Sequence, residues 1–420
     1  MPERIAIIGS GIAGLGCAHF LHRRAELTVF EAGDYIGGHS NTITISDNDQ
    51  EVVLDTGFMV YNEVTYPLLT RLFAELDVRT KTTSMSFSVQ QLQSGVEWNG
   101  ASINTLFGQR RNLLSLRHWR FLAQLNRFNK EALPALEEPQ WAEMTLQEYV
   151  DARGYGQDFL ERYLIPMSSA VWSTPHEQML QFPAMTLLRF WHNHGFLGLD
   201  KQHQWRTVDG GSREYVKRLV EPFRERIHTK TPVLAVRTTD AGVEIDSPRG
   251  TECFNKVVLA SHADQSLKLL ETPTALQVEL LSPFAYQQNS VRVHTDTKFM
   301  PKTQRCWASW NYRSGRKGNS THYWMNSLQD VSDKKDYFVS LNASEGVPEA
   351  ASKRALDYEH PLFDLNAIKA QKRLPELNDP KGRTFFCGSY FRYGFHEDAF
   401  RSSVDLCHSL LKGDPWEVAV

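Results

Sequence analysis

Apolar and polar residues alternate in blocks over the first thirty positions, and these blocks predict a strand, a helix and a second strand. Residues 5–8 are a short apolar run, which is the pattern of a strand buried on both faces. A helix is expected to begin near Ile12, and residues 27–30 fit a second short strand. The order strand, glycine-rich turn, helix and strand is typical of a βαβ unit that binds a dinucleotide.

Three glycines separate the first strand from the helix, at the spacing G-x-G-x-x-G. We expect Gly9 to allow the tight turn, Gly11 to let the backbone approach a pyrophosphate, and Gly14 to let helix and strand pack closely. The first turn of the helix then offers free N–H groups to the phosphates. Glu31 follows about 20 residues later, where a carboxylate accepts a hydrogen bond from a ribose hydroxyl and repels a 2′-phosphate. The ligand is therefore expected to be FAD or NAD rather than NADP.

The nucleotide-binding pattern stops near residue 80 and returns twice, which predicts a chain that weaves between two domains. Residues 109–200 are mainly helical and rich in Trp, Phe and Met. A Gly-Gly turn into a helix reappears at Gly210, and residues 256–260 fit another buried strand. We expect a discontinuous nucleotide-binding domain at 1–80, 205–270 and 378–420, and a substrate domain at 81–204 and 271–377, with 81–107 and 271–377 as its sheet and 108–204 as its helical part.

Composition limits the class of protein. The 420 residues are 41% hydrophobic and 23% charged, which is ordinary for a globular chain of two or three domains. The net charge of −3 gives no reason to expect nucleic acid as a partner. The five cysteines lack C-x-x-C spacing, so a reduced cytoplasmic protein is expected, whereas the oligomeric state stays open. The first strand begins too early to leave room for a signal peptide, and no apolar run approaches the roughly 20 residues that span a bilayer.

A basic and apolar stretch at 110–122 has two interpretations. In the first, it is an amphipathic helix with a solvated basic face. In the second, it docks on anionic lipid headgroups as a peripheral contact with the inner face of the membrane. The residues concerned are Arg110, Arg111, Leu113, Leu114, Leu116, Arg117, Trp119, Arg120, Phe121 and Leu122.

Residues 31–42 read Glu-Ala-Gly-Asp-Tyr-Ile-Gly-Gly-His-Ser-Asn-Thr and add a second signature. This run resembles the extended glutathione-reductase-type FAD motif of the flavin amine oxidase, phytoene desaturase and protoporphyrinogen oxidase superfamily. In that motif an Ile-Gly-Gly tail and a threonine follow the ribose-binding acid, so the resemblance implies FAD rather than NAD. It also implies an α/β, Rossmann-like, discontinuous FAD-binding domain and an α+β substrate domain that carries an antiparallel sheet and a helical subdomain.

The end of the chain resembles the closing FAD motif of the same superfamily. That motif has a strand ending in glycine, here Gly388, and then Gly-aromatic-x-Glu-x-Ala at a helix start, here residues 394–399. Asp398 and Ser403 depart from it, because the family more often has glycine there. In the resembled superfamily a valine at the place of Val233 meets the adenine through its backbone, so the resemblance implies the same role for Val233. The glycine turn and the resemblance together imply these cofactor-binding residues: Gly9, Ser10, Gly11, Ile12, Ala13, Gly14, Glu31, Gly38, His39, Ser40, Gly57, Phe58, Val233, Gly388, Ser389, His396 and Glu397.

Further segments resemble a bacterial branch of the superfamily that is associated with modification of fatty acyl chains. They are Met300-Pro301, Trp307-Ala-Ser-Trp-Asn311 and Tyr323-Trp-Met-Asn326. The resemblance implies an FAD-dependent oxidoreductase that desaturates or oxidises a hydrophobic acyl substrate by hydride transfer to flavin N5. A redox-neutral isomerase, an amine oxidase and a non-catalytic flavoprotein partner stay open. Non-covalent FAD is expected, because the place of Cys387 in the motif is structural.

Few polar residues are needed for this chemistry, because the flavin itself carries the redox step. The resembled amine oxidases place a lysine on a strand of the substrate sheet and two aromatic residues as a cage near the flavin. Residues 286–294 contain no lysine, which weakens amine oxidation, whereas Phe395 fits one cage position. His192 and His194 have three interpretations: a metal site with His203, ordinary hydrogen-bonded side chains, or a proton acceptor on the substrate side of the flavin. We predict no metal site, and we take His192, His194 and Phe395 as candidate catalytic residues.

The helical block contains many large apolar side chains. They fit either a helix core or the wall of a tunnel for a long apolar substrate. The residues are Trp172, Phe182, Met185, Leu187, Leu188, Phe190, Trp191 and Phe196.

Overall fold

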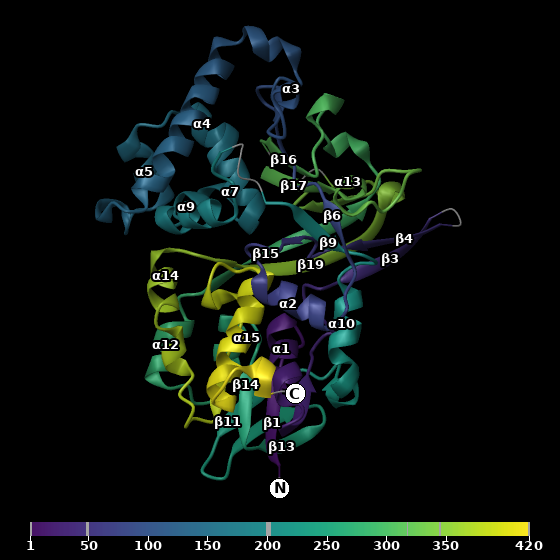
Figure 1. Ribbon diagram of the computed structural model, residues 1–420, viewed down its shortest axis with the longest axis vertical. Helices are drawn as coiled ribbons and strands as arrows, with labels where there is room; N and C mark the ends of the chain where they lie inside the picture. The colour runs from purple at the N-terminus through teal and green to yellow at the C-terminus, as the bar shows by residue number, and fades with distance from the viewer. Residues whose placement is uncertain (1, 48–49, 199–202, 317, 344–345, 419–420) are drawn as a thin grey trace.

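The computed structural model describes residues 2–47, 50–198, 203–316, 318–343 and 346–418. Figure 1 shows a parallel sheet with flanking helices in the lower part of the view. A second sheet and a block of helices beside it form the upper part. No helix in the described ranges is both long and apolar enough to cross a bilayer.

The lower sheet has five parallel strands in the order β10-β2-β1-β14-β20. Ile5 and Ile7 of β1 pack in one apolar cluster with α1, α10 and α15, which lie beside the sheet in Figure 1. Ala6 and Ile8 point to the opposite face and pack with the small antiparallel sheet β11-β12-β13. The bounds are β1 (Glu3–Ile8), α1 (Ile12–Leu21), β2 (Ala25–Phe30), α10 (Arg213–Val220), β10 (Ile227–His228), β11 (Ala235–Thr238), β12 (Val243–Ser247), β13 (Gly250–Phe254), β14 (Lys256–Leu259), β20 (Thr384–Phe386) and α15 (His396–Leu411).

Because these strands come from three separated stretches of the chain, the domain is discontinuous, as the resemblance implied. The boundaries given above for the two domains stay a prediction.

The upper sheet has seven strands in the order β19-β15-β18-β17-β16-β7-β8. Neighbouring strands are antiparallel, except that β7 and β16 run parallel with Phe87 beside Trp310. The expected antiparallel sheet is therefore present, and the added β7-β8 hairpin makes it mixed. The bounds are β7 (Phe87–Gln91), β8 (Val96–Asn99), β15 (Ala285–His294), β16 (Trp310–Gly315), β17 (Gly318–Trp324), β18 (Phe338–Leu341) and β19 (Ser352–Leu362).

The helical block covers one end of this sheet and has its own apolar core. Tyr149, Phe159 and Trp191 are almost completely buried in it. Its helices are α3 (Ile103–Leu106), α4 (Leu116–Ala135), α5 (Leu146–Arg153), α6 (Gln157–Phe159), α7 (Ile165–Trp172), α8 (His176–Leu180) and α9 (Ala184–Asn193).

The basic stretch at 110–122 is not one continuous helix. It is a short 3-10 turn, η1 (Arg110–Leu114), followed by the start of α4. Ser115 separates the two because its backbone is extended and its Oγ accepts a hydrogen bond from the His118 N–H at 3.2 Å.

A buried carboxylate connects the two parts of the molecule. Asp55, at the end of β4 (Gln50–Asp55), is 1% exposed. Its oxygens accept hydrogen bonds from Thr42 Oγ1 at 2.5 Å, from the Ser212 N–H at 2.9 Å and from Gln329 Nε2 at 2.8 Å. Thr42 belongs to β3 (Thr42–Asp47), Ser212 precedes α10, and Gln329 ends α13 (Met325–Gln329) beside the upper sheet. Three distant stretches of the chain are thus held at one point.

Candidate functional site

The glycine turn between β1 and α1 leaves no room for side chains at two of its three glycines. A Cβ on Gly9 would lie 2.9 Å from the Ala260 carbonyl oxygen, and the φ of Gly9 is +104°. A Cβ on Gly14 would lie 2.0 Å from the Gly9 carbonyl oxygen. A Cβ on Gly11, in contrast, would meet no atom within 4 Å. Gly9 and Gly14 therefore serve close packing, and Gly11 borders open space.

The open space lies at the N-terminus of α1. Gly11 is the N-cap of this helix and makes no side-chain capping hydrogen bond, so the first-turn N–H groups of Ile12 and Ala13 are not capped by it. Gly38 lies against the same turn, because a Cβ on it would be 3.1 Å from the Gly11 Cα. A helix start without a cap and beside two glycines is a site for phosphate groups.

Glu31 follows β2 and faces the glycine turn. Its carboxylate accepts hydrogen bonds from the Ser10 N–H at 2.9 Å, from Ser10 Oγ at 2.5 Å and from the Gly33 N–H at 2.7 Å. These donors fix the carboxylate, and its remaining lone pairs suit a ribose hydroxyl. Val233 lies nearby, since the Thr231 N–H donates to the Glu31 carbonyl oxygen at 2.8 Å. No hydrogen bond between described residues uses the N–H or carbonyl group of Val233, so both are free for a base.

Three predicted cofactor residues from distant stretches meet at the start of α15. The ring of Phe58 stacks on that of His396, with centroids 3.9 Å apart. His396 Nε2 lies 2.7 Å from the Tyr215 hydroxyl and 3.3 Å from Ser40 Oγ. Burial lowers the pKa of His396 to about 3, so its ring is neutral at physiological pH. The residue before Phe58 is Gly57, where a Cβ would lie only 2.3 Å from the His39 carbonyl oxygen.

His39 presents a buried polar atom that has no partner. Its Nε2 makes no hydrogen bond within the described part of the chain. The ring stacks on Tyr358 with centroids 4.9 Å apart, and the centroid of His360 is 5.2 Å away. Burial, followed by the proximity of His360, holds the pKa of His39 well below its usual range. This unpaired buried nitrogen is available to hydrogen-bond a bound group.

A hydrogen bond fixes the backbone just after the closing strand β20. The Gly388 N–H donates to Ser402 Oγ at 2.8 Å, and Ser389 begins the short turn η9 (Ser389–Phe391). Cys387 is fully buried, and its Sγ lies 3.7 Å from that of Cys17. The contact with Cys17 and burial raise the pKa of the Cys387 thiol. The thiol therefore stays protonated and packs inside the domain.

Glu397 has a different environment from the other predicted cofactor residues. Its carboxylate accepts the N–H groups of Leu68 at 3.1 Å and Leu69 at 3.0 Å, at the start of α2 (Pro67–Glu75). Arg401 adds an ion pair at 3.2 Å. Burial outweighs these partners and raises the pKa of Glu397 to about 7. Glu397 thus caps α2, and a direct contact with the cofactor stays a prediction.

Together these features fit FAD. The uncapped start of α1 suits the pyrophosphate, Glu31 suits the ribose, the free backbone of Val233 suits the adenine, and the unpaired nitrogen of His39 accepts or donates a further hydrogen bond. Ser40, Phe58 and His396 meet at the start of α15.

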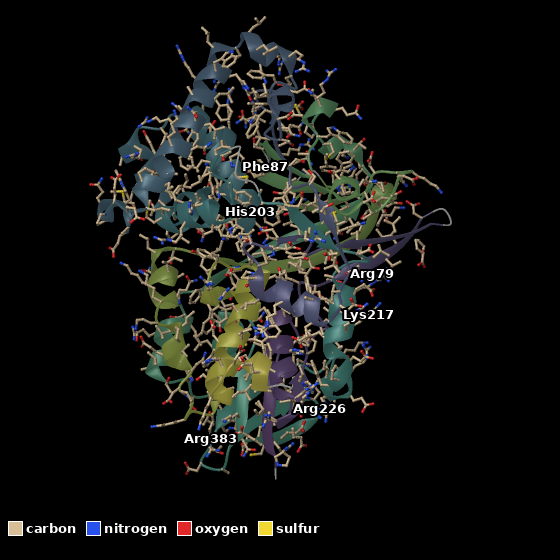
Figure 2. The ribbon with its side chains drawn as sticks, in the orientation of Figure 1. Arg79, Phe87, His203, Lys217, Arg226 and Arg383 are labelled. Atoms are coloured by element: carbon tan, nitrogen blue, oxygen red, sulfur yellow. The ribbon has the colours of Figure 1, made fainter. Side chains whose placement is uncertain are left out.

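A cavity of about 620 Å³ lies beside the start of α15, between α2, α4 and α9. The three candidate catalytic residues His192, His194 and Phe395 all line it. His203 also lines it, at the junction of the helical block and the lower domain in Figure 2. The lining residues are Val64, Thr65, Tyr66, Pro67, Asn129, Leu133, His192, Asn193, His194, Gly195, Leu197, His203, Arg392, Tyr393, Phe395, Glu397, Asp398 and Arg401.

His194 is held in one tautomer inside an aromatic stack. Its Nδ1 lies 2.9 Å from the Phe190 carbonyl oxygen, which can only accept, so Nδ1 carries the proton and Nε2 a lone pair. Its ring stacks on Phe190 at 3.8 Å, and Phe190 stacks on Phe395 at 4.7 Å. Burial lowers the pKa of His194 to about 4. A neutral imidazole beside the cavity can accept a proton.

The large apolar residues of the helical block form core rather than cavity wall. Trp172, Phe182 and Phe190 are at most 5% exposed, and none of the eight residues considered for a tunnel lines the described cavity.

Among the described residues, no three His, Cys, Asp or Glu side chains are arranged to hold a metal ion.

Sequence reasoning missed several residues of the cavity. Arg392 and Arg401 flank the closing motif, but the motif gave no indication of where they point. Tyr66 is the residue before α2. Pro67 could have indicated a helix start there, because proline is common at the first position of a helix.

The open space at Gly11 gives a test of cofactor binding. The variant Gly11→Glu should keep the fold, because the φ of −68° suits any residue, but should lose FAD by placing a carboxylate at the phosphate position. The matched variant Gly11→Gln has similar bulk without charge and should retain more FAD. The flavin absorbance of purified protein, before and after incubation with FAD, measures this. Equal FAD content in both variants would contradict a phosphate site at this turn.

The raised pKa of Glu397 predicts a pH-dependent stability. Because the folded pKa of about 7 exceeds the unfolded one, the contribution of Glu397 is greatest below about pH 4.5 and is lost as the pH rises through 7. The difference corresponds to about 3 kcal/mol at most. Urea unfolding between pH 4.5 and 7.5 should show wild type losing stability relative to Glu397→Gln. The exposed control Glu137→Gln should run parallel to wild type, and parallel curves for Glu397→Gln would refute the prediction.

Comparison with known proteins places this site in a family. Residues 12–335 match the model of the family described as flavin-containing amine oxidoreductases. A curated relative, the flavin-containing amine oxidase A of Canis lupus familiaris, is 23% identical over 248 residues. That alignment covers 58% of this chain and 46% of the relative, so the chain spans about half the length of the relative it matches.

Solved structures share the fold over nearly the whole chain. Cyclohexylamine oxidase from Brevibacterium oxydans IH-35A superposes with a TM-score of 0.71 at 16% identity, covering 98% of this chain and 99% of that enzyme. A CLA-producing fatty acid isomerase from P. acnes superposes with a TM-score of 0.68 at 14% identity, covering 96% and 97%. With the family match over most of its length and a site that fits FAD, this chain belongs to the flavin-containing amine oxidoreductase family.

Proposed function

We propose that the chain is an FAD-dependent oxidoreductase that acts on a fatty acyl chain held in the cavity beside Phe395. The observation that carries the proposal is an exposed arginine at the rim of this cavity. Arg392 lines the cavity and makes no ion pair with any described residue. A guanidinium without an ion pair, at a cavity whose wall is partly apolar, suits a ligand with a carboxylate head and a hydrocarbon chain.

The charge around the cavity favours an anion over an ammonium group. Arg392 and Arg401 are permanently charged. Burial raises the pKa of Glu397 to about 7 and that of Asp398 to about 6, so the two acids are not fully ionised at neutral pH. The four groups together are therefore net positive near pH 7, which attracts a carboxylate and disfavours a protonated amine.

The size and walls of the cavity also suit an acyl chain. Its volume of about 620 Å³ falls within the roughly 300–1,000 Å³ of small-molecule sites. Tyr66, Leu133, Leu197 and Phe395 supply apolar surface. A long hydrocarbon chain would bury this surface and its own, whereas a small polar substrate would not.

The residues of the chain have separable tasks in this proposal. Bound FAD would supply the hydride acceptor at N5. The lone pair on His194 Nε2 would accept the proton that leaves the substrate carbon, since the ring is neutral above pH 4. Phe395 would contact the chain and exclude water, Phe190 would support the ring of Phe395 from behind, and Arg392 would bind the carboxylate.

The solved relatives support two substrate classes. The fatty acid isomerase supports an acyl substrate, and cyclohexylamine oxidase supports an amine. Strand β15 contains no lysine, and Lys298 beyond it pairs with Asp296 at 3.1 Å, so no lysine of this strand is available for amine oxidation. A redox-neutral isomerase is the second candidate. A double-bond shift would use the same residue to bind the carboxylate, Arg392, and the same residue to accept a proton, His194.

The proposal is tested by mixing the oxidised holoprotein anaerobically with a long-chain unsaturated fatty acid, and separately with an alkylamine of equal length. We expect the fatty acid to bleach the flavin and the amine to leave it unchanged. Unchanged flavin absorbance with a shifted double bond would establish the isomerase instead. Bleaching by the amine alone would overturn the acyl substrate.

Arg392 gives a specific prediction for the carboxylate. Arg392→Gln should raise the KM for a free fatty acid about ten-fold, because a charge-assisted hydrogen bond contributes about 1.5 kcal/mol or more. The KM for the methyl ester of the same acid should not change. The control Arg224→Gln, at an exposed arginine of η4 (Glu221–Arg226), should match wild type with both. An equal rise for acid and ester would contradict a carboxylate site at Arg392.

A further inference from the structure

The upper end of the molecule in Figure 1, at α3, η1 and the start of α4, exposes an unusual group of apolar side chains. Leu114 is 92% exposed, and Ile103 and Leu116 are each 75% exposed. These are the three most exposed large apolar residues in the described part of the chain. With Leu113 and Trp119, at 46% and 48%, they form what we call the apical patch.

The apical patch is a built surface rather than a set of loose side chains. Trp119 Nε1 donates to the Leu113 carbonyl oxygen at 2.9 Å, and the Trp119 ring lies 5.1 Å from that of Phe107. Arg110 donates to Asn104 Oδ1 at 2.6 Å and thereby ties η1 to α3. The exposed side chains are therefore held together on a fixed backbone.

A strong positive charge accompanies the apical patch. Residues 101–120 contain four arginines and no acidic residue, whereas the whole chain has a net charge of −3. Arg117 is paired with Asp158. Arg110 and Arg111 donate to uncharged oxygens, so their charges are not neutralised there. Arg120 is exposed and has no ion pair with a described residue.

We infer that the apical patch docks on the surface of an anionic phospholipid bilayer. Exposed Leu, Ile and Trp side chains insert at the level of the headgroups, and the surrounding arginines pair with lipid phosphates. A nucleic acid would engage the arginines but leave the leucines in water, whereas an anionic bilayer engages both. The inference does not depend on the proposed substrate, because the patch and the cavity are separate surfaces, with Trp119 and Leu133 about 20 Å apart along α4.

Flotation of the holoprotein with vesicles tests the inference. Vesicles of 60% phosphatidylcholine and 40% phosphatidylglycerol should bind at least ten-fold more protein than pure phosphatidylcholine in 0.1 M NaCl, and 0.5 M NaCl should reduce this binding. Leu114→Ser/Leu116→Ser and Arg111→Glu/Arg120→Glu should each reduce it at least five-fold. The matched controls Val278→Ser and Arg224→Glu, at exposed sites elsewhere, should bind like wild type.

Flavin absorbance and the thermal unfolding midpoint of each variant show that the fold is kept. Wild type that binds neither vesicle type, or binds both equally, would overturn the inference. Binding that is unchanged in both patch variants would overturn it as well. If wild type is a dimer that Leu114→Ser/Leu116→Ser converts to a monomer, and no vesicle binding occurs, the patch is an interface between copies of this chain.

Discussion

The buried carboxylate of Asp55 is the contact on which the arrangement of the site depends. It joins Thr42, Ser212 and Gln329, which lie in three distant stretches of the chain and in both parts of the molecule. Because a buried carboxylate needs these donors, the network favours one relative position of the glycine tail, the start of α10 and the upper sheet. In that position Phe58 and His396, from distant stretches of the chain, stack on one another.

The cavity next to this path combines features that a cofactor domain alone would not require. A nucleotide can be held without an aromatic stack at this place, yet Phe395, Phe190 and His194 form one along the cavity. Burial lowers the pKa of His194, which keeps its ring neutral, and raises the pKa values of Glu397 and Asp398. Two arginines, Arg392 and Arg401, line the same cavity. The result is a site with a partly apolar wall, a neutral histidine and net positive charge, which is the basis for proposing a carboxylate-bearing acyl substrate.

The local part of this site could be predicted from the sequence, and the distant part could not. Gly9, Gly14 and Glu31 lie within one βαβ unit, so their spacing along the chain fixes their spacing in space. His192, His194 and Phe395 were predicted one by one, but their meeting depends on the packing of Phe190 against Phe395, which no local pattern encodes. The partners of Glu397 at the start of α2, the free position of Arg392 and the parallel pairing of β7 with β16 are likewise set by tertiary contacts.

The most direct test of the central claim is a difference spectrum of the oxidised flavin during titration with a saturated fatty acid that does not react. If the cavity beside Phe395 is the substrate site and prefers a carboxylate, the flavin absorption should change saturably with the acid. An alkylammonium ion of the same length should cause no change at the same concentrations. A saturable change with the ammonium ion and none with the acid would contradict the account.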